Sequence, residues 1–322
     1  MTLVGRRPVV SAQALVAGLR VPPHFVHATL DSYVPDPAFA SQQSARDQVQ
    51  AFAAAVPQGR RRRSTGQGLY LDGGFGVGKT HLLAALATSV GERATFGTFV
   101  QYTHLVGALG FAGARDALSQ FALVCIDEFE LDDPGDTVLM ARLMRELSDA
   151  GVALAATSNT LPESLGQGRF AADDFRREIQ AVAAVFTVVS IDGPDYRHRG
   201  ALHFDTLTAD AVADFANVPG GQTVVWSQLV ADLAHVHPSR LGAYIEGVQR
   251  LGLVDVAPLA DQSQALRVVS LVDRLYDADV RIGASGTNLG EIFPPDMLAG
   301  GYRKKYYRAL SRLAAMCSDD PA

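Results

Sequence analysis

One eight-residue motif constrains this chain more than any other feature. Residues 73–80 read Gly-Gly-Phe-Gly-Val-Gly-Lys-Thr and fill every fixed position of the pattern G-x-x-x-x-G-K-[ST]. A short apolar strand, Leu69 to Leu71, precedes the motif, and a helix starts at His81. A strand before and a helix after are the context that a phosphate-binding loop requires, so we prefer that interpretation to a chance glycine-rich turn.

The residue types of the loop suit the binding of a phosphate chain. Glycines let the backbone curl so that N–H groups face the anion, and the following helix N-terminus favours negative charge. Lys79, one of only three lysines against 25 arginines, supplies a cation for the β- and γ-phosphates, and the Thr80 hydroxyl is placed to ligate Mg²⁺. The expected nucleotide-binding residues are Gly73, Gly74, Phe75, Gly76, Val77, Gly78, Lys79, Thr80 and His81.

A second segment supplies the acidic groups that such a site needs. Phe121 to Ile126 is a continuous apolar run, as expected for a strand buried on both faces of a parallel sheet, and it ends in Asp127-Glu128. Alone this pattern is common, but downstream of a phosphate loop it indicates a metal ligand, Asp127, and a residue that polarises the attacking water, Glu128.

The second strand is expected over Thr95 to Gln101, and two further strands complete the expected sheet. Val152 to Thr157 is apolar and ends in Ser158-Asn159, and Val185 to Ile191 is the fifth strand. Asn159 fits a residue that touches the γ-phosphate and the attacking water, while a turn-forming asparagine is the alternative. Strands that alternate with helices predict an α/β fold with a parallel sheet flanked by helices, and a nucleotide site at the carboxyl ends of the strands.

Several arginines are candidates for contacts with anions. Arg169, Arg176 and Arg177 lie where an arginine finger can reach a neighbouring subunit's γ-phosphate, and we favour Arg169, although a surface salt bridge is the commoner role for any single arginine. The run from Arg60 to Arg63 fits a solvated loop best, with an anionic partner as the alternative.

The C-terminal part carries no second phosphate loop or acidic pair. Leu253 to Val256, Gln262 to Tyr276 and Val280 to Ser285 predict a second β-α-β unit, which can extend the sheet, in place of an all-helical lid. The last helix, Tyr302 to Met316, has five basic residues, of which Arg308, or alternatively Arg312, can reach the nucleotide as "sensor 2". The expected parts are an N-terminal segment (1–66), a P-loop ATPase core (67–200) and an α/β extension (201–322).

Composition narrows the class of protein. The 322 residues, 48% hydrophobic and 19% charged, are typical of a chain with a substantial buried core. The net charge of −6 argues against bulk nucleic-acid binding, and no apolar run approaches the length of a membrane span. Two cysteines form no disulfide framework, which fits the cytoplasm. The first thirty residues contain several arginines and no acidic residue, which is a feature of transit peptides. Pro22-Pro23 would interrupt a long amphipathic helix, so we favour an ordinary N-terminal segment.

These motifs together resemble the ZapE family of cell-division ATPases, whose mitochondrial relatives are the AFG-like ATPases. The resemblance covers about residues 25–316 and includes blocks that are uncommon in other P-loop ATPases. The matching segments are Asp127-Glu128-Phe129 with Asp133 and Asp136, Ala156 to Asn159, Arg169-Phe170, Asp195-Tyr196-Arg197, Leu271 to Asp277, and Arg308 to Leu313.

The resemblance implies an AAA+-like, Mg²⁺-dependent ATPase that couples hydrolysis to the remodelling of a protein assembly in cell division. It also implies protein partners, a nucleotide-dependent homo-oligomer and a cytoplasmic location. Asp72, where the family often has Trp, and Pro162, where it has paired prolines, are departures that bear on partner contacts rather than on ATP chemistry.

Two other functions compete with this one. A helicase-loading ATPase of the DnaA or DnaC kind is one alternative, because residues 76–82 resemble theirs, although no basic helix-turn-helix is evident. The other is an adaptor that binds ATP without hydrolysing it, against which Glu128 argues.

Overall fold

The computed structural model describes most of the chain and divides it into two compact units. The described residues are 2–56, 68–74, 76–129, 134–160, 180, 183–184, 186–194 and 204–317. One unit comprises residues 12–198 and is called here the ATPase unit. The other comprises residues 1–11 and 199–322 and is called the C-terminal unit, so the chain passes between the units twice.

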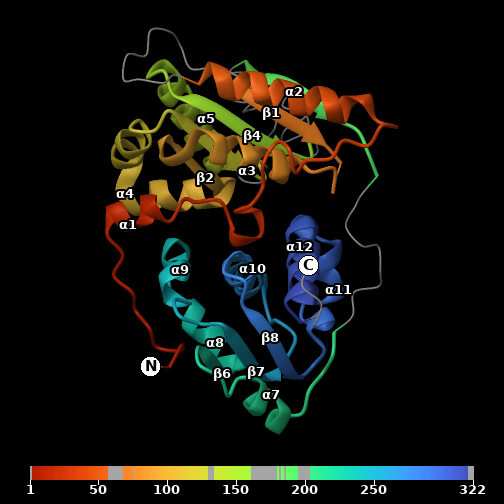
Figure 1. The fold of residues 1–322 in the computed structure, drawn as a ribbon. Helices are drawn as coiled ribbons and strands as arrows, with labels where there is room; N and C mark the ends of the chain where they lie inside the picture. The colour runs from red at the N-terminus through yellow and green to blue at the C-terminus, as the bar shows by residue number, and fades with distance from the viewer. Residues whose placement is uncertain are drawn as a thin grey trace. The chain divides into compact units, whose positions relative to one another are not determined.

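A five-stranded parallel sheet forms the centre of the ATPase unit (Figure 1). Its order is β2-β3-β4-β1-β5, which places the phosphate-loop strand β1 between β4 and β5. The parallel α/β fold predicted from the sequence is therefore confirmed. The strands are β1 (Gly68–Gly73), β2 (Ala94–Thr98), β3 (Leu123–Asp127), β4 (Ala153–Ser158) and β5 (Phe186–Ile191).

Helices bury both faces of this sheet. Successive strand residues point to opposite faces, so Leu69 and Leu71 pack into one hydrophobic cluster and Tyr70 into another. The first cluster includes α2 (Ala40–Ala55) and α3 (Lys79–Val90). The second includes α4 and α5, with α1 packed against it. These helices are α1 (Ala12–Ala17), α4 (Phe99–Leu118) and α5 (Pro134–Asp149).

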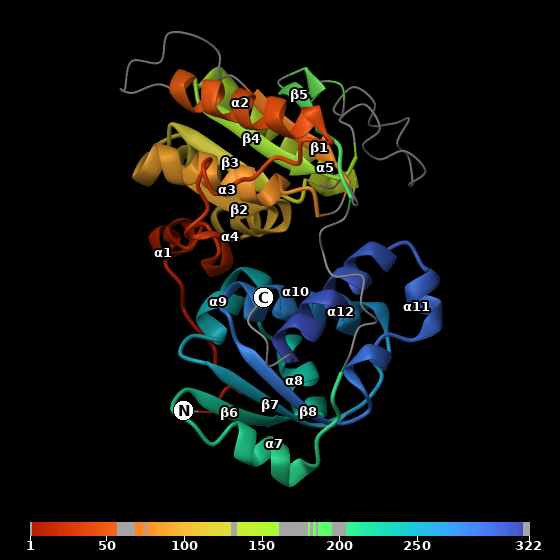
Figure 2. The ribbon, with the colours of Figure 1, turned by 45° about the vertical axis from the view of Figure 1, so that its right-hand side comes forward.

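The C-terminal unit has a sheet of its own, β6-β7-β8, also parallel (Figure 2). The predicted β-α-β unit is present as β7, α10 and β8. The expectation that it can extend the ATPase sheet is wrong, because its partner strand is β6. The elements are α7 (Ala209–Phe215), β6 (Gly221–Val225), α8 (Trp226–Leu233), α9 (Leu241–Tyr244), β7 (Arg250–Val256), α10 (Gln262–Asp277), β8 (Arg281–Gly286), α11 (Pro295–Ala299) and α12 (Arg303–Cys317).

Two paired glycines let α7 pack closely on the second sheet. Gly252 on β7 lies opposite Gly283 on β8. A Cβ at Gly252 would lie 2.7 Å from Val212 Cγ1, and one at Gly283 would lie 2.8 Å from Phe215 Cδ1. The small residues therefore make room for α7, while α8, α10 and α12 contribute to the main hydrophobic cluster of this unit.

The first residues of the chain are anchored in the C-terminal unit. Leu3 is fully buried in its hydrophobic cluster. The carboxylate of Asp232 accepts hydrogen bonds from the Gly5 amide at 2.9 Å, from Arg7 at 2.7 Å and from the Tyr244 hydroxyl at 2.8 Å. These contacts hold residues 2–7, called here the N-terminal arm, although helix α1 that follows belongs to the ATPase unit.

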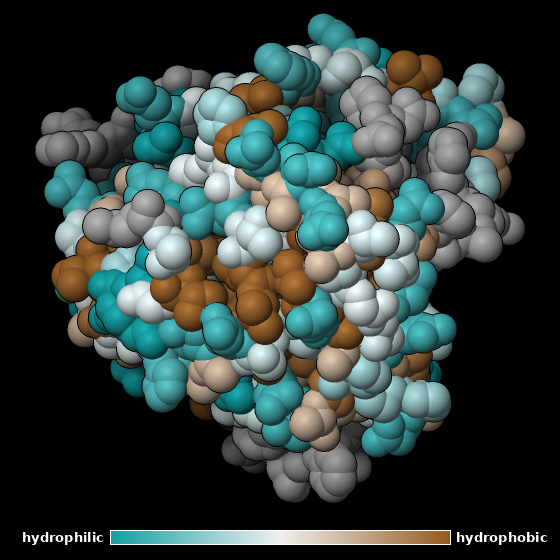
Figure 3. All heavy atoms as spheres, turned by 90° about the horizontal axis from the view of Figure 1, so that it is seen from below, coloured by the Kyte–Doolittle hydropathy of each residue, from teal (hydrophilic) through white to brown (hydrophobic). Residues whose placement is uncertain are grey.

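Exposed apolar side chains are few among the described residues. The large ones are spread along the sequence rather than concentrated in one segment. Figure 3 shows hydrophobic residues gathered near the middle of one face, with hydrophilic residues around them. Within the described part of the chain, no helix has both the length and the apolar character to cross a membrane. The exposed large hydrophobic residues are Val9, Val26, Val34, Val138, Val188, Val225 and Tyr307.

Candidate active site

The glycines of the phosphate loop occupy backbone conformations that other residues rarely adopt. Gly76 has a φ of 74° and Gly78 a φ of 88°. A Cβ at Gly78 would also lie 2.5 Å from Cε2 of Tyr33, and one at Gly73 would lie 2.3 Å from the Ile191 carbonyl oxygen. Glycine at these positions therefore lets the loop turn between β1 and α3 beneath the Tyr33 ring. Phe75 lies outside the described residues.

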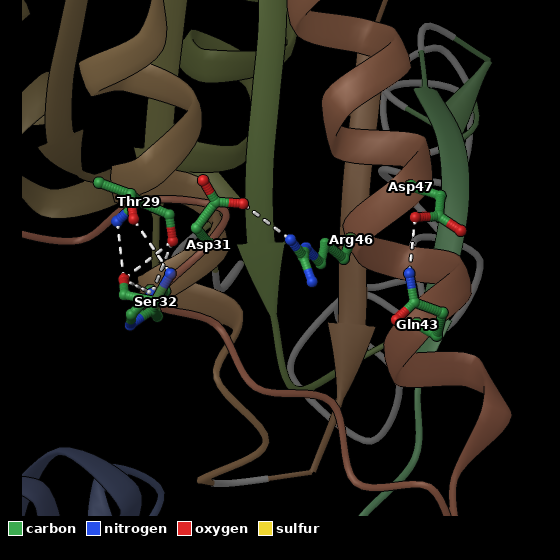
Figure 4. A network of polar contacts seen from close by, with 7 residues as sticks. Thr29, Asp31, Ser32, Gln43, Arg46 and Asp47 are labelled. Carbon is green, nitrogen blue, oxygen red and sulfur yellow. Dashed lines mark hydrogen bonds and ion pairs between the residues drawn. The ribbon is translucent and has the colours of Figure 1, made fainter.

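An N-terminal segment braces the start of α3. The Tyr33 hydroxyl donates a hydrogen bond to the Val77 carbonyl at 3.1 Å. Figure 4 shows the turn of Thr29 and Ser32. His81 contacts this turn, because Nε2 of its imidazole lies 2.9 Å from Ser32 Oγ and 3.1 Å from the Thr29 carbonyl. The imidazole thus faces this segment, while the His81 backbone belongs to the first turn of α3.

An ion pair ties the same segment to α2. Arg46 donates to the Asp31 carboxylate at 2.9 Å, and Gln43 bonds Asp47 one turn along the same helix at 2.7 Å (Figure 4). Asp31 is almost fully exposed, so this pair adds little stability. No motif or spacing in the sequence predicted that residues 29–33 would lie beside the phosphate loop.

The ammonium of Lys79 is buried and held by three oxygens. It donates to the carbonyl of Gly73 at 2.7 Å, to the carbonyl of Gly74, and to Asn159 Oδ1 at 2.9 Å. The side chain is thus fixed at the mouth of the loop, where the N-terminal turn of α3 also favours negative charge. The structure brings together Lys79 and Asn159, two residues that the sequence assigned to the same phosphate.

The two expected metal ligands are hydrogen-bonded to each other. The Thr80 hydroxyl lies 3.1 Å from Asp127 Oδ1 and 3.3 Å from Oδ2, and Asp127 is buried. In proteins Mg²⁺ is bound by one or two carboxylates together with substrate phosphates, and a hydroxyl beside a carboxylate next to a phosphate loop is such a donor set. The residues present therefore fit the ion.

Glu128 stands at a sharp turn immediately after β3. Its φ of 53° is a left-handed conformation that is uncommon for residues other than glycine. Its amide donates to Thr157 Oγ1 at 3.1 Å, and the next amide, of Phe129, donates to the Thr157 carbonyl at 2.7 Å. The acidic pair is thus held by the neighbouring strand β4.

Thr157 is a site residue that the sequence reasoning missed. Its hydroxyl donates to Asp127 Oδ1 at 2.5 Å, besides accepting from the Glu128 amide. The available signal was a polar residue, two positions before Asn159, that follows the apolar run Ala153 to Ala156.

Asp72, near the end of β1, has a raised pKa. Partial burial raises it, and this effect outweighs the hydrogen bond from the Gly73 amide and the charge of Lys79, which both lower the pKa. Tyr70, two residues earlier, is fully buried, and its hydroxyl donates to the Thr160 carbonyl at 2.7 Å. This bond fastens the segment after Asn159 to β1.

Of the remaining expected site residues, two belong to the C-terminal unit and the others fall outside the described residues. Arg308, on α12 of the C-terminal unit, forms an ion pair with Asp273 at 2.9 Å, and Arg312 contacts the same carboxylate. Their contact with a nucleotide stays a prediction. Arg169, Arg176, Arg177 and the run from Arg60 to Arg63 lie outside the described residues.

Comparison with known proteins identifies the family. A family model described as AFG1-like ATPase matches residues 9–210 and 210–321. The chain is similar to cell division protein ZapE of Escherichia coli K12, with 28% identity over 79% of each chain. It is also similar to lactation elevated protein 1 homolog B of Danio rerio, with 25% identity over 67% of this chain and 54% of the other.

Two solved structures also resemble this chain over about half of its length. The DnaC helicase loader matches 52% of this chain and 99% of its own, with 19% identity and a TM-score of 0.39. Domain III of Thermotoga maritima DnaA matches 54% and 70%, with 20% identity and a TM-score of 0.41. The family model spans nearly the whole chain, and the phosphate loop and acidic pair that ATP hydrolysis requires are both in place. The chain belongs to the AFG1-like ATPase family and is an ATP hydrolase.

Proposed function

We propose that the chain uses Mg²⁺ to hydrolyse ATP and couples this reaction to the remodelling of a protein assembly in cell division, within the cytoplasm. The observation that carries the Mg²⁺ requirement is the Thr80 hydroxyl 3.1 Å from the buried Asp127 carboxylate, beside the loop that holds Lys79. The cellular role is supported by the similarity to a relative named cell division protein ZapE.

Each residue of the site has a distinct part in this reaction. The loop amides and Lys79 bind the β- and γ-phosphates, and Thr80 with Asp127 would hold the cation. When bound, Mg²⁺ neutralises charge that builds up on the phosphate oxygens. Glu128 accepts a proton from the attacking water, and Asn159 orients that water and the γ-phosphate.

An oligomer that forms with ATP is the expected working form, and Arg169 is our candidate finger. A finger stabilises charge that develops only in the transition state, so Arg169→Ala lowers turnover and leaves ATP affinity nearly unchanged. A mixture of Arg169→Ala with Lys79→Ala regains partial activity, because an intact arginine then faces an intact loop. A mixture as inactive as its parts, while subunits exchange, contradicts a role in trans.

The proposed function is tested by steady-state hydrolysis with the purified full chain. We expect phosphate release that requires Mg²⁺, stops in EDTA and does not respond to single-stranded DNA. Turnover that rises strongly with DNA would instead favour the helicase-loading alternative. Tight ATP binding without turnover would favour the adaptor, and native mass measured with and without ATP tests the oligomer.

A further inference from the structure

One residue of strand β4 contacts three successive residues of the acidic turn. The Thr157 hydroxyl donates to Asp127 Oδ1 at 2.5 Å and accepts from the Glu128 amide at 3.1 Å, and its carbonyl accepts from the Phe129 amide at 2.7 Å. Thr157 is only 2% exposed, so water cannot readily replace these partners. The turn is thus attached to one point on the neighbouring strand.

The backbone of the turn needs such support. A left-handed residue other than glycine costs about 1–2 kcal/mol, and Glu128 has a φ of 53°. The two amides that bond Thr157 belong to Glu128 itself and to the following residue. Phe129 is fully buried, with its ring 5.1 Å from that of Phe99 in an edge-on contact. Thr157 therefore fixes the turn that presents Glu128.

Two hydroxyls bond the carboxylate of Asp127. Thr157 Oγ1 lies 2.5 Å from Asp127 Oδ1, and Thr80 Oγ1 lies 3.1 Å from the same carboxylate oxygen. The single proton of the Thr157 hydroxyl is donated to Asp127 Oδ1, and a lone pair of Thr157 Oγ1 accepts the hydrogen bond from the Glu128 amide. One hydroxyl is therefore shared between the metal ligand and the base.

We propose that Thr157 is the positioning residue of this ATPase, whose hydroxyl couples the orientation of Asp127 to that of Glu128. This inference rests on the proposed Mg²⁺-dependent hydrolysis. Thr157 does not touch ATP; it acts through the two acidic residues. Removal of the hydroxyl lets the Asp127 carboxylate rotate and leaves the Glu128 amide without its acceptor, so metal use and turnover both suffer while the phosphate loop is untouched.

The decisive variants are Thr157→Val, which keeps the branched shape and loses the hydroxyl, and Thr157→Ser, which keeps the hydroxyl. Partners of metal ligands typically contribute about 10- to 100-fold. We expect Thr157→Val to lower kcat by about that factor, to raise the Mg²⁺ concentration for half-maximal rate about tenfold, and to leave ATP affinity in EDTA within about threefold. Thr157→Ser, which keeps the hydroxyl, should retain most of the wild-type kcat and a Mg²⁺ requirement close to that of the wild type.

Thr95→Val is the matched control. Thr95 is also a buried strand threonine of the ATPase unit, and its hydroxyl donates to the Leu19 carbonyl at 3.2 Å, away from the acidic pair. The Thr95→Val variant should lose about as much stability as Thr157→Val and should keep the Mg²⁺ dependence of the wild type. If Thr157→Val lowers the melting temperature too far for assay, Thr157→Ala replaces it.

The outcomes separate the two proposals. A wild-type chain that hydrolyses ATP without Mg²⁺ overturns the proposed function. A Mg²⁺-dependent wild type whose Thr157→Val variant keeps its kcat and metal requirement overturns the positioning role alone. The positioning role is also overturned if Thr157→Ser is as impaired as Thr157→Val, or if Thr95→Val shows the same shift in Mg²⁺ requirement as Thr157→Val.

Discussion

Lys79 Nζ lies 2.9 Å from Oδ1 of Asn159, which joins the phosphate loop to the end of β4 across 80 residues of sequence. The lysine also bonds the carbonyls of Gly73 and Gly74, so its position does not depend on the asparagine alone. Asn159 can therefore exchange its contact with Lys79 for one with a phosphate or a water, while the lysine stays in place.

The first prediction concerns this asparagine. Asn159→Ala should lower kcat about 100-fold, the order of effect found when one preorganised donor is removed, because the attacking water loses its orientation. ATP affinity should stay within about threefold, since Lys79 keeps its loop contacts. Steady-state kinetics and equilibrium binding measure the two quantities, with the exposed Asn217→Ala as control. A large loss of affinity at unchanged kcat would show that Asn159 serves binding only.

The second prediction separates backbone conformation from close packing in the phosphate loop. Gly78 and Gly247 both have positive φ, 88° and 77°, but of the two only Gly78 has a neighbour in the way: a Cβ there would lie 2.5 Å from the Tyr33 ring. Gly247→Ala should lose about 1 kcal/mol in urea unfolding. Gly78→Ala should lose more and bind ATP poorly, and Tyr33→Ala in the same chain should restore part of the binding. Equal losses for the two single variants would exclude the contact as the cause.

The sequence was sufficient for the parts of the site that follow a local rule. The phosphate loop and the acidic pair are defined by contiguous residues, so their strand and helix context could be predicted. The strand predicted over Thr95 to Gln101 ends earlier, at Thr98. There the Thr98 hydroxyl and the Gln101 side chain form a capping box that starts α4.

The parts that could not be predicted depend on pairing between distant segments. Thr157 looks like an ordinary strand residue, and only the register of β4 beside β3 gives it a role. A β-α-β pattern identifies its own two strands but not the sheet they join, so the separate sheet of the C-terminal unit was missed. Nothing in the sequence around Leu3 predicted that this residue would be buried in the C-terminal unit.

The third prediction concerns the ion pairs of α12. Burial alone would raise the pKa of Asp273, but the charges of Arg308, Arg312 and Arg274 outweigh it and lower the pKa to about 2. A carboxyl with a lowered pKa stabilises the fold above its unfolded value near 4, and this stability is lost as the pH falls toward 2. The ionised Asp273 and its arginine partners should contribute about 2 kcal/mol to the free energy of unfolding at neutral pH, and about half of this contribution is lost by pH 3.

Urea unfolding at pH 6 and pH 3 measures this dependence. Asp273→Asn should lower the free energy of unfolding by about 3 kcal/mol at pH 6, because two partly buried arginines lose their counter-charge. The gap between wild type and variant should narrow by about 1 kcal/mol at pH 3. The exposed Asp296→Asn is the control, and a gap that is independent of pH would contradict the lowered pKa.

The fourth prediction concerns the N-terminal arm. Asp232 has a lowered pKa, because hydrogen bonds from Arg7, the Gly5 amide and Tyr244 outweigh the effect of burial. Asp232→Ala removes the common acceptor of all three, so the arm should detach and trypsin should cut after Arg6 at least about tenfold faster, whereas the Arg7–Pro8 bond resists trypsin. Mass spectrometry of the digest locates the cuts. Asp214→Ala, at an exposed position of the same unit, should leave the rate of trypsin cleavage unchanged. A cleavage rate for Asp232→Ala equal to that of the wild type would refute the anchoring role.

The most direct test of the account is the turnover of Glu128→Gln. This change keeps the shape of the side chain and the hydrogen bonds of its backbone while removing the proton acceptor. We predict that the variant binds ATP in Mg²⁺ at least as tightly as the wild type, and that its rate of phosphate release falls by more than about 100-fold. Glu92→Gln, at an exposed position of the same unit, should hydrolyse ATP normally. Hydrolysis by Glu128→Gln at the wild-type rate would contradict the assignment of this site.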